Sequence, residues 1–356
     1  MICIYNLYRE LMGNNGLNNT EVHNILNDTS SQNLILFYEK IQGKFPDIES
    51  RLLTRFTPCK VMQYILNNSK TMKKYIYNLK PNITLEYYAK TKPTKSIIER
   101  IKLRVLYLQP IHWNKVLNIV IYPSTLKKQF PINYNYLGPN EINSGLSTIY
   151  KYTDKREIVI YRSEELLKVL VHELIHAYEF DNKSYENKSF NRCLDIPMEH
   201  TLNLNESFTE FYSVIYTIFF ELLETNKRKP TMAQVGKRIR AEVSYGALKV
   251  AQILHFFGYT KFEEFYNPSG ITGITGITGI NRFQFQFKEK TSIISYFIVK
   301  LFILANYKEN LNKPFHDIFS NPIKLFSNDK LKKQINKYLR DGTFRDKSLR
   351  MTSIKK

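Results

Sequence analysis

The sequence predicts an α+β fold that is predominantly helical and contains a small mixed sheet. Apolar residues recur at helical spacing through most of residues 1–110 and again from about residue 204 onward. Between these regions lie three short runs rich in β-branched residues, which are typical of strands. With 356 residues, 43% of them hydrophobic, the chain is long enough to bury a substantial core.

The first 110 residues are expected to form a helical N-terminal region. Helices are predicted at 30–45, 57–79 and 94–108, where apolar residues follow helical spacing. Pro81 and Pro93 separate the second helix from the third.

Residues 111–224 are expected to form a compact core. Strands are predicted at 116–124, 144–152 and 156–162, with a turn at 153–155 between the last two. Ser163 then precedes two acidic residues and a long apolar repeat, which predicts a helix that Ser163 caps. A polar loop follows, and a second long helix begins at about Leu204.

The remaining residues are expected to be helical again. Residues 225–346 form a predicted C-terminal subdomain, interrupted by a surface loop at 269–281 that repeats a Gly-Ile-Thr tripeptide. Three copies of so short a repeat are too few for a solenoid. Residues 347–356 are expected to be a flexible tail.

The stretch HELIH places His172 and His176 four residues apart on the first core helix. Residues at this spacing differ by about 40° in direction, so both imidazoles project from one face and can bind one metal ion. Glu173 lies about 60° round the helix from His176, beside such an ion rather than on it. This position suits a carboxylate that takes a proton from an activated water molecule.

A catalytic zinc site has three protein ligands and an open fourth position. The chain does not continue with the third histidine of the metzincin pattern, because Glu179 and Asn182 stand where that pattern has Gly and His. The third ligand is therefore sought among the acidic residues downstream, namely Asp181, Asp195, Glu199, Glu206 and Glu210.

The segment NESFTEF, in which Asn205-Glu206 precede Glu210 by four residues, adds a second motif to HELIH. Together the two resemble the zinc-binding motifs of gluzincins, the thermolysin and aminopeptidase type of zinc peptidase. The resemblance covers about residues 116–224, although the stretch between the two motifs is longer than in the shortest members of that family. It implies a zincin-like core, one zinc ion per chain, and hydrolysis of a peptide or protein substrate.

The resemblance also implies individual roles. Glu206 becomes the third ligand, and Glu210 becomes the carboxylate that orients His172. An edge strand ahead of the zinc helix is expected to bind extended substrate through the backbone of Ser144, Gly145 and Leu146. Tyr296 is the first candidate for the donor that holds the oxyanion, with Tyr245 and His255 as alternatives.

The charge distribution supports an alternative hypothesis. The net charge is +20, and residues 328–356 carry ten basic against three acidic residues, whereas residues 168–210 carry eight acidic against four basic residues. A basic surface is compatible with a nucleic-acid-associated or packaging protein whose zinc site is not catalytic, although no nucleic-acid-binding motif is present.

Other classes of protein are not favoured. Cys3, Cys59 and Cys193 are too few and too far apart for a disulfide framework or a thiolate zinc site. No apolar run reaches the roughly 18 residues that a membrane span needs, and no secretory signal is recognised, so we expect an intracellular protein that does not bind membranes.

Overall fold

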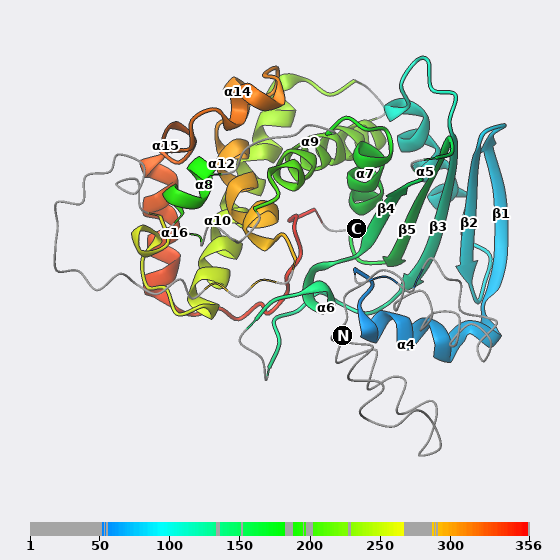
Figure 1. Cartoon of the computed structure of the whole chain (residues 1–356), viewed down its shortest axis with the longest axis horizontal. Coiled ribbons are helices and arrows are strands. Elements are labelled where there is room, and N and C mark those ends of the chain that lie inside the picture. Colours follow the sequence, from blue (N-terminus) through cyan, green and yellow to red (C-terminus); the bar gives the residue numbers. More distant parts are fainter. Residues whose placement is uncertain are drawn as a thin grey trace.

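The computed structural model describes residues 52, 54, 56–132, 136–150, 152–181, 188–194, 196, 202–226, 229–266, 287, 289 and 291–354. These residues form a mixed α+β structure, about half of it helical, with one five-stranded sheet (Figure 1). The predicted α+β class with a small mixed sheet is confirmed. The helix expected at 30–45 and the repeat loop at 269–281 lie outside the described residues.

The sheet has the strand order β1-β2-β3-β5-β4. Strands β2, β3 and β5 are mutually parallel, whereas β1 pairs antiparallel with β2, and β4 pairs antiparallel with β5. The strands are β1 (Lys73–Lys80), β2 (Ile83–Ala89), β3 (Val116–Ser124), β4 (Gly145–Ile149) and β5 (Lys155–Arg162). Among the described residues, the strand predicted at 144–152, β4, therefore lies at an edge of the sheet.

Both faces of the central strands are buried. On one face the isoleucines of β3 and β5 pack against α5 (Lys95–Leu108) and α7 (Leu166–Ala177). On the other face, Val120 and Val159 pack against α4 (Cys59–Asn68). This double burial explains why β3 and β5 are almost continuously apolar in sequence.

The expectation of a mostly helical segment over residues 1–110 is wrong for residues 73–89. The predicted helix at 57–79 ends at Asn68, is followed by the short helix η3 (Ser69–Thr71), and then becomes β1, which pairs with β2. The sequence of β1, KKYIYNLK, alternates aromatic and apolar residues with other side chains at a period of two. We attribute the error to reading this β-branched and aromatic run as a continuation of the preceding helical pattern.

The remaining helices form the larger part of the structure. The two longest are α9 (Leu204–Asn226) and α10 (Met232–Phe256). Later in the chain come the π-helix η5 (Ile294–Val299), α12 (Lys300–Ala305) and α16 (Asp329–Asp341). The shorter elements are α6 (Pro139–Ile142), α8 (Lys188–Cys193), η4 (Phe262–Glu264), α13 (Tyr307–Asn310), α14 (Phe315–Phe319) and α15 (Pro322–Leu325).

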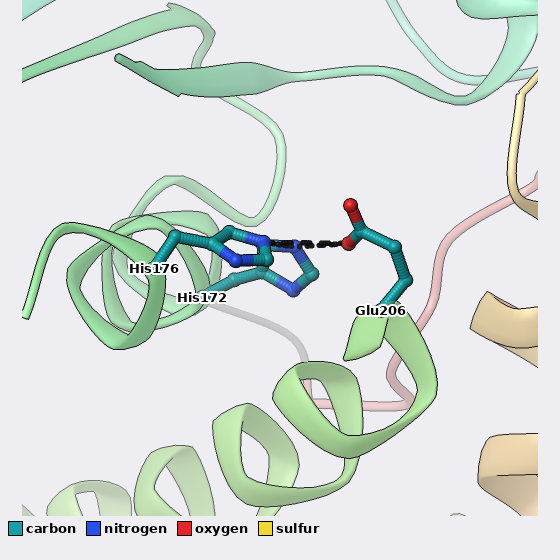
Figure 2. Close-up of side chains that lie close together, drawn as sticks. All are labelled: His172, His176 and Glu206. Carbon is teal, nitrogen blue, oxygen red and sulfur yellow. Dashed lines mark hydrogen bonds and ion pairs between the residues drawn. The ribbon is translucent and has the colours of Figure 1, made fainter. Parts of the chain in front are cut away.

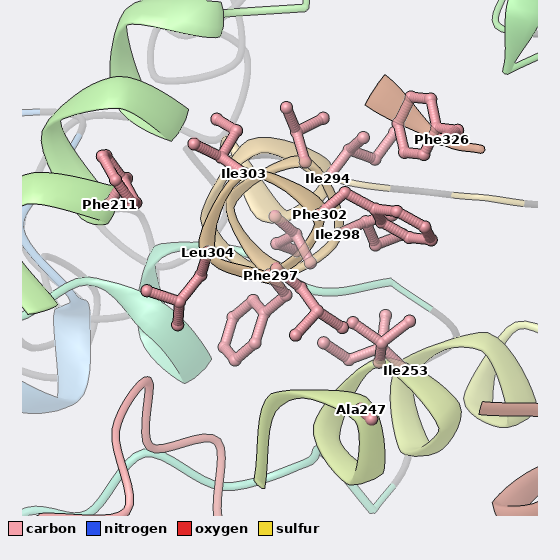
Figure 3. Packing of buried hydrophobic residues seen from close by; sticks show 14 of the residues in the cluster. Phe211, Ala247, Ile253, Ile294, Phe297, Ile298, Phe302, Ile303, Leu304 and Phe326 are labelled. Atoms are coloured by element: carbon pink, nitrogen blue, oxygen red, sulfur yellow. The ribbon is translucent and has the colours of Figure 1, made fainter. Parts of the chain in front are cut away.

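Segment η5–α12 lies at the centre of the helical core. Figure 3 shows its side chains radiating toward Phe211 of α9, toward Ala247 and Ile253 of α10, and toward Phe326. Helices α7 and α9 lie between the sheet and the C-terminal helices (Figure 1). Phe220 of α9 packs in the cluster that contains α7 and the sheet, whereas Phe211 of α9 packs in the cluster around η5–α12, so α9 joins the two.

The expectation of a flexible tail after residue 346 is also wrong for residues 347–354. Leu349 is fully buried in the helical core, and Met351 is only 8% exposed. The backbone N–H groups of Met351 and Thr352 donate to the buried carboxylate of Glu165 at 2.9–3.2 Å. This segment is held by apolar anchors and by charged partners far away in the sequence, which local composition does not reveal. Residues 355–356 lie outside the described part.

None of the helices in the described part of the chain is both long and apolar enough to cross a membrane.

Replacing Leu349 by Ala should lower the free energy of unfolding by about 2–5 kcal/mol, because it removes a fully buried leucine side chain. Ile111→Ala is the control, since Ile111 is 96% exposed, and it should change stability by less than about 0.5 kcal/mol. Urea denaturation followed by circular dichroism measures both. Equal effects would mean that this segment is frayed in solution.

Candidate metal centre

The histidine helix α7 begins at Leu166, immediately after Glu165, and packs between the sheet and α9. Ser163 does not cap it, contrary to expectation. Its hydroxyl instead donates to the carbonyl of Ser124 at 2.8 Å, and Glu165, in the left-handed region with φ = 58°, is the residue that precedes the helix. The side chain of Glu165 binds the Met351 segment rather than the helix.

Helix α9 brings Glu206 to the histidines. Figure 2 shows both imidazoles projecting from α7 toward the carboxylate of Glu206, which lies in the first turn of α9. The two Nε2 atoms are 3.1 Å apart, and Glu206 Oε2 lies 3.2 Å from that of His172 and 3.3 Å from that of His176. Donor atoms bound tetrahedrally to zinc at 2.0–2.2 Å lie about 3.3 Å apart. The spacing of the three atoms therefore fits an ion of this size and geometry.

The outer nitrogen of each histidine is bound to a carboxylate. His172 Nδ1 lies 3.0 Å from Glu210 Oε2, and His176 Nδ1 lies 2.6 Å from Asp181 Oδ2. When Nδ1–H donates to a carboxylate, Nε2 carries a lone pair instead of a proton.

When both imidazoles are neutral and in that tautomer, two lone pairs and one carboxylate oxygen face one another. Without a metal ion, the carboxylates raise the pKa values of both histidines, which favours a proton between the histidines and Glu206 Oε2. These three side chains could hold a metal ion, and theirs is the one such group of His, Cys, Asp and Glu side chains found among the described residues.

The acids downstream of the histidines take different positions. Glu206 lies where the resemblance expects a ligand and Glu210 where it expects the partner of His172. Asp181 is not a ligand; it accepts hydrogen bonds from His176 and, at 2.8 Å, from the hydroxyl of Thr209. From the sequence, Asp181 was considered only as a possible metal ligand. Its position five residues after His176 was the available signal for its contact with that histidine. Asp195 and Glu199 lie outside the described residues.

Two buried lysines close to Glu210 were not predicted from the sequence. Lys168 donates to Glu210 Oε2 at 2.5 Å, and Lys300 is buried close enough to Glu210 to lower its pKa. Burial opposes ionisation of Glu210, but Lys168, His172 and Lys300 lower the pKa of that carboxyl to about 2. Lys168 stands four residues before His172, the same interval as between the histidines, and this spacing was a usable signal.

The pKa values of His176 and Glu206 reflect the contacts between these charged groups. Burial alone would lower the pKa of His176, but the carboxylates of Glu206 and Asp181 raise it well above its usual value. Burial alone would raise the pKa of Glu206, but the two histidines lower it far below its usual value. In each case the positive and negative groups of the cluster stabilise one another.

Glu173 and Tyr296 line the same small pocket as His172. Burial raises the pKa of the Glu173 carboxyl. Burial, followed by the negative charges of Glu206 and Glu173, raises the pKa of Tyr296 well above its usual value, so its hydroxyl stays protonated and able to donate. Tyr296 lies on the π-helix η5, with its ring 5.9 Å from that of His172.

The two alternatives to Tyr296 lie elsewhere. The hydroxyl of Tyr245 donates to the carbonyl of Arg350 at 3.2 Å, and the ring of His255 packs against Phe344. Neither residue lines the pocket that contains His172 and Glu173.

The edge strand approaches Glu173 closely. A Cβ atom at Gly145 would lie 3.0 Å from Val169 Cγ1 and 3.1 Å from Glu173 Oε1, so only glycine fits here without displacing a neighbour. Ser144 and Gly145 line the pocket, whereas the side chain of Leu146 packs on the opposite face of the sheet. Within the described residues, β4 pairs with β5 on one side only.

Comparisons with known proteins give little further information. No family model matches the chain, and no solved structure matches it. Over 109 residues the chain is 31% identical to "Uncharacterized protein R210" of Acanthamoeba polyphaga mimivirus, an alignment that covers 29% of this chain and 27% of that protein. The chain thus spans little more than a quarter of the length of this relative.

Asp181→Asn should weaken zinc binding by about 10- to 100-fold, because it removes the carboxylate that fixes His176 in its ligating tautomer. Glu179→Gln is a matched control: Glu179 is two residues away but binds Lys115 and Arg156 instead. Competition with a chromophoric chelator measures both affinities. A loss of equal size in both variants would contradict the assigned role of Asp181.

Proposed function

We propose that this protein is a zinc-dependent peptidase of the gluzincin type, with a zincin-like core formed by the sheet, α7 and α9. The observation that carries the proposal is the convergence of His172, His176 and Glu206 at ligand spacing, with Glu173 and Tyr296 beside them. A metal site without a catalytic role does not require a buried carboxylate and a protonated phenol at its edge. Both groups are what hydrolysis of an amide needs.

His172, His176 and Glu206 would hold the zinc ion. When bound, zinc supplies Lewis-acid chemistry, polarising a carbonyl oxygen and lowering the pKa of a water molecule. Three protein ligands leave the fourth tetrahedral position open, as in catalytic rather than structural sites.

Glu173 is the general base in this proposal. Its carboxylate takes a proton from the attacking water and then passes it to the nitrogen of the leaving amine. Because burial raises its pKa toward neutral pH, the carboxylate accepts a proton more readily than an exposed glutamate would.

Tyr296 and the edge strand position the substrate. The protonated hydroxyl of Tyr296 donates a hydrogen bond to the oxyanion that develops on the substrate carbonyl. The outer side of β4 pairs with no other strand of the described residues, and it offers backbone groups to an extended peptide, which would add to the sheet next to Glu173.

The nucleic-acid alternative has no specific structural observation in its favour. The basic residues of 328–354 belong partly to α16, and the segment after it is packed into the core rather than extended as a free arm. Asp346 and Asp329 of this region are paired with Lys249 and Lys332.

Glu173→Gln should abolish peptide hydrolysis while leaving zinc content at the wild-type level, because it removes the base but none of the ligands. Zinc per chain by atomic emission and cleavage of an unfolded protein substrate such as casein provide the two readouts. Glu206→Gln is the comparison, and it should lose both zinc and activity. Turnover by Glu173→Gln at a rate near that of the wild type would refute the mechanism.

Tyr296→Phe should lower kcat by about 10²- to 10³-fold with little change in KM, because the hydroxyl acts on charge that develops only in the transition state. Tyr152→Phe is the control, since Tyr152 is 98% exposed. Steady-state kinetics on a fluorogenic peptide separates kcat from KM. An unchanged kcat would assign oxyanion binding to another group.

A further inference from the structure

The pocket beside Glu173 and Tyr296 is closed by a residue from outside the core that resembles gluzincins. Its walls are formed by α7, by the segment that leads into β4, and by the side chain of Met351. The remaining cavity has a volume of about 30 Å³. An engineered cavity of about 150 Å³ holds a benzene ring, so this much smaller cavity accepts a small group but no large branched or aromatic side chain.

Met351 is fixed in this position through its backbone. Its N–H donates to Glu165 Oε1 at 3.0 Å, and its carbonyl accepts from Lys300 Nζ at 3.1 Å. The next residue, Thr352, also donates to Glu165. Because Glu165 and Lys300 are themselves buried, the segment cannot shift without exposing or unpairing charged groups.

Charge does not determine what this pocket accepts. Lys128 and Lys168 both line it, but Lys128 is paired with Glu165, and Lys168 is paired with Glu210. The hydroxyl of Ser144 is buried there and has no hydrogen-bond partner in the described part of the chain. The walls are thus suited to a small, uncharged side chain, and a hydroxyl group has a partner available.

We propose that Met351 is a specificity-determining residue that restricts the substrate side chain next to the scissile bond to glycine, alanine or serine. The inference rests on the proposed peptidase function, because Glu173 and Tyr296 place the reacting carbonyl at the mouth of this pocket. A side chain flanking that carbonyl on one side then points at the thioether of Met351. Shortening Met351 should enlarge the pocket.

The test compares Met351→Ala with Met351→Leu, a change that nearly conserves volume. Zinc-loaded proteins are incubated with a peptide library, and the cleavage sites are identified by mass spectrometry. Wild type and Met351→Leu should cleave next to small residues. For Met351→Ala, kcat/KM at sites flanked by leucine or phenylalanine should rise by at least about tenfold. Val169→Ala, which opens the opposite wall, should have the same effect if Met351→Ala does not fold.

A second readout does not depend on turnover. Calorimetry on zinc-loaded Glu173→Gln measures the binding of hydroxamates that carry a methyl, isobutyl or benzyl side chain. The methyl compound should bind at least about tenfold more tightly than the other two, and Met351→Ala in the same background should remove that difference.

The outcomes separate the two proposals. Wild-type protein that accepts leucine or phenylalanine as readily as alanine, or folded enlarged variants that keep the wild-type preference, would overturn the role of Met351 while leaving hydrolysis intact. Hydroxamate selectivity that depends on Met351, in a protein that cleaves no peptide, would support the pocket and refute the proposed function.

Discussion

The packing of α7 against α9 is the constraint on which the site depends. It places Glu206 against the two histidines and Glu210 one turn further along, where Oε2 accepts from His172 and from Lys168. A buried carboxylate costs several kcal/mol to desolvate unless it is paired, and Glu210 is completely buried. The ion pair with Lys168 supplies that partner and joins the two helices directly.

The same electrostatic reasoning supports the proposal that the site binds a cation. Glu173, Glu206, Glu210 and Asp181 bring four carboxylates into one buried region, and Lys168 and Lys300 supply two compensating charges. Burial opposes the ionisation of all four, but neighbouring histidines and lysines lower the pKa values of Glu206, Glu210 and Asp181, and only that of Glu173 is raised. A divalent ion bound to His172, His176 and Glu206 would balance the remaining charge. It would also leave Glu173 the one acid of the four that is neither a ligand nor bound to a histidine.

The site was more predictable than its surroundings, for physical reasons. His172, Glu173 and His176 follow from helix geometry alone, and the positions of Glu206 and Glu210 follow from a second motif on another helix. The contacts of Asp181 and Lys168 were signalled only by their spacing from the histidines, and Lys300 had no such signal, because charged residues on a helix are usually solvated. The strand β1 was misread because aromatic and β-branched runs fit two periodicities. The segment around Met351 was misread because partners such as Glu165 and Glu242 lie over 100 residues away.

Glu165 connects the start of the histidine helix α7 with the segment around Met351. A non-glycine residue in the left-handed region costs on the order of 1–3 kcal/mol and persists only where surrounding contacts enforce it. Here the contacts are the buried ion pair with Lys128 and the two N–H groups of Met351 and Thr352, all on one carboxylate. Because Glu165 directly precedes α7, the strain is located where the histidine helix begins. The side chain of Glu165 thus links the segment that lines the pocket to the start of the helix that carries the two histidines.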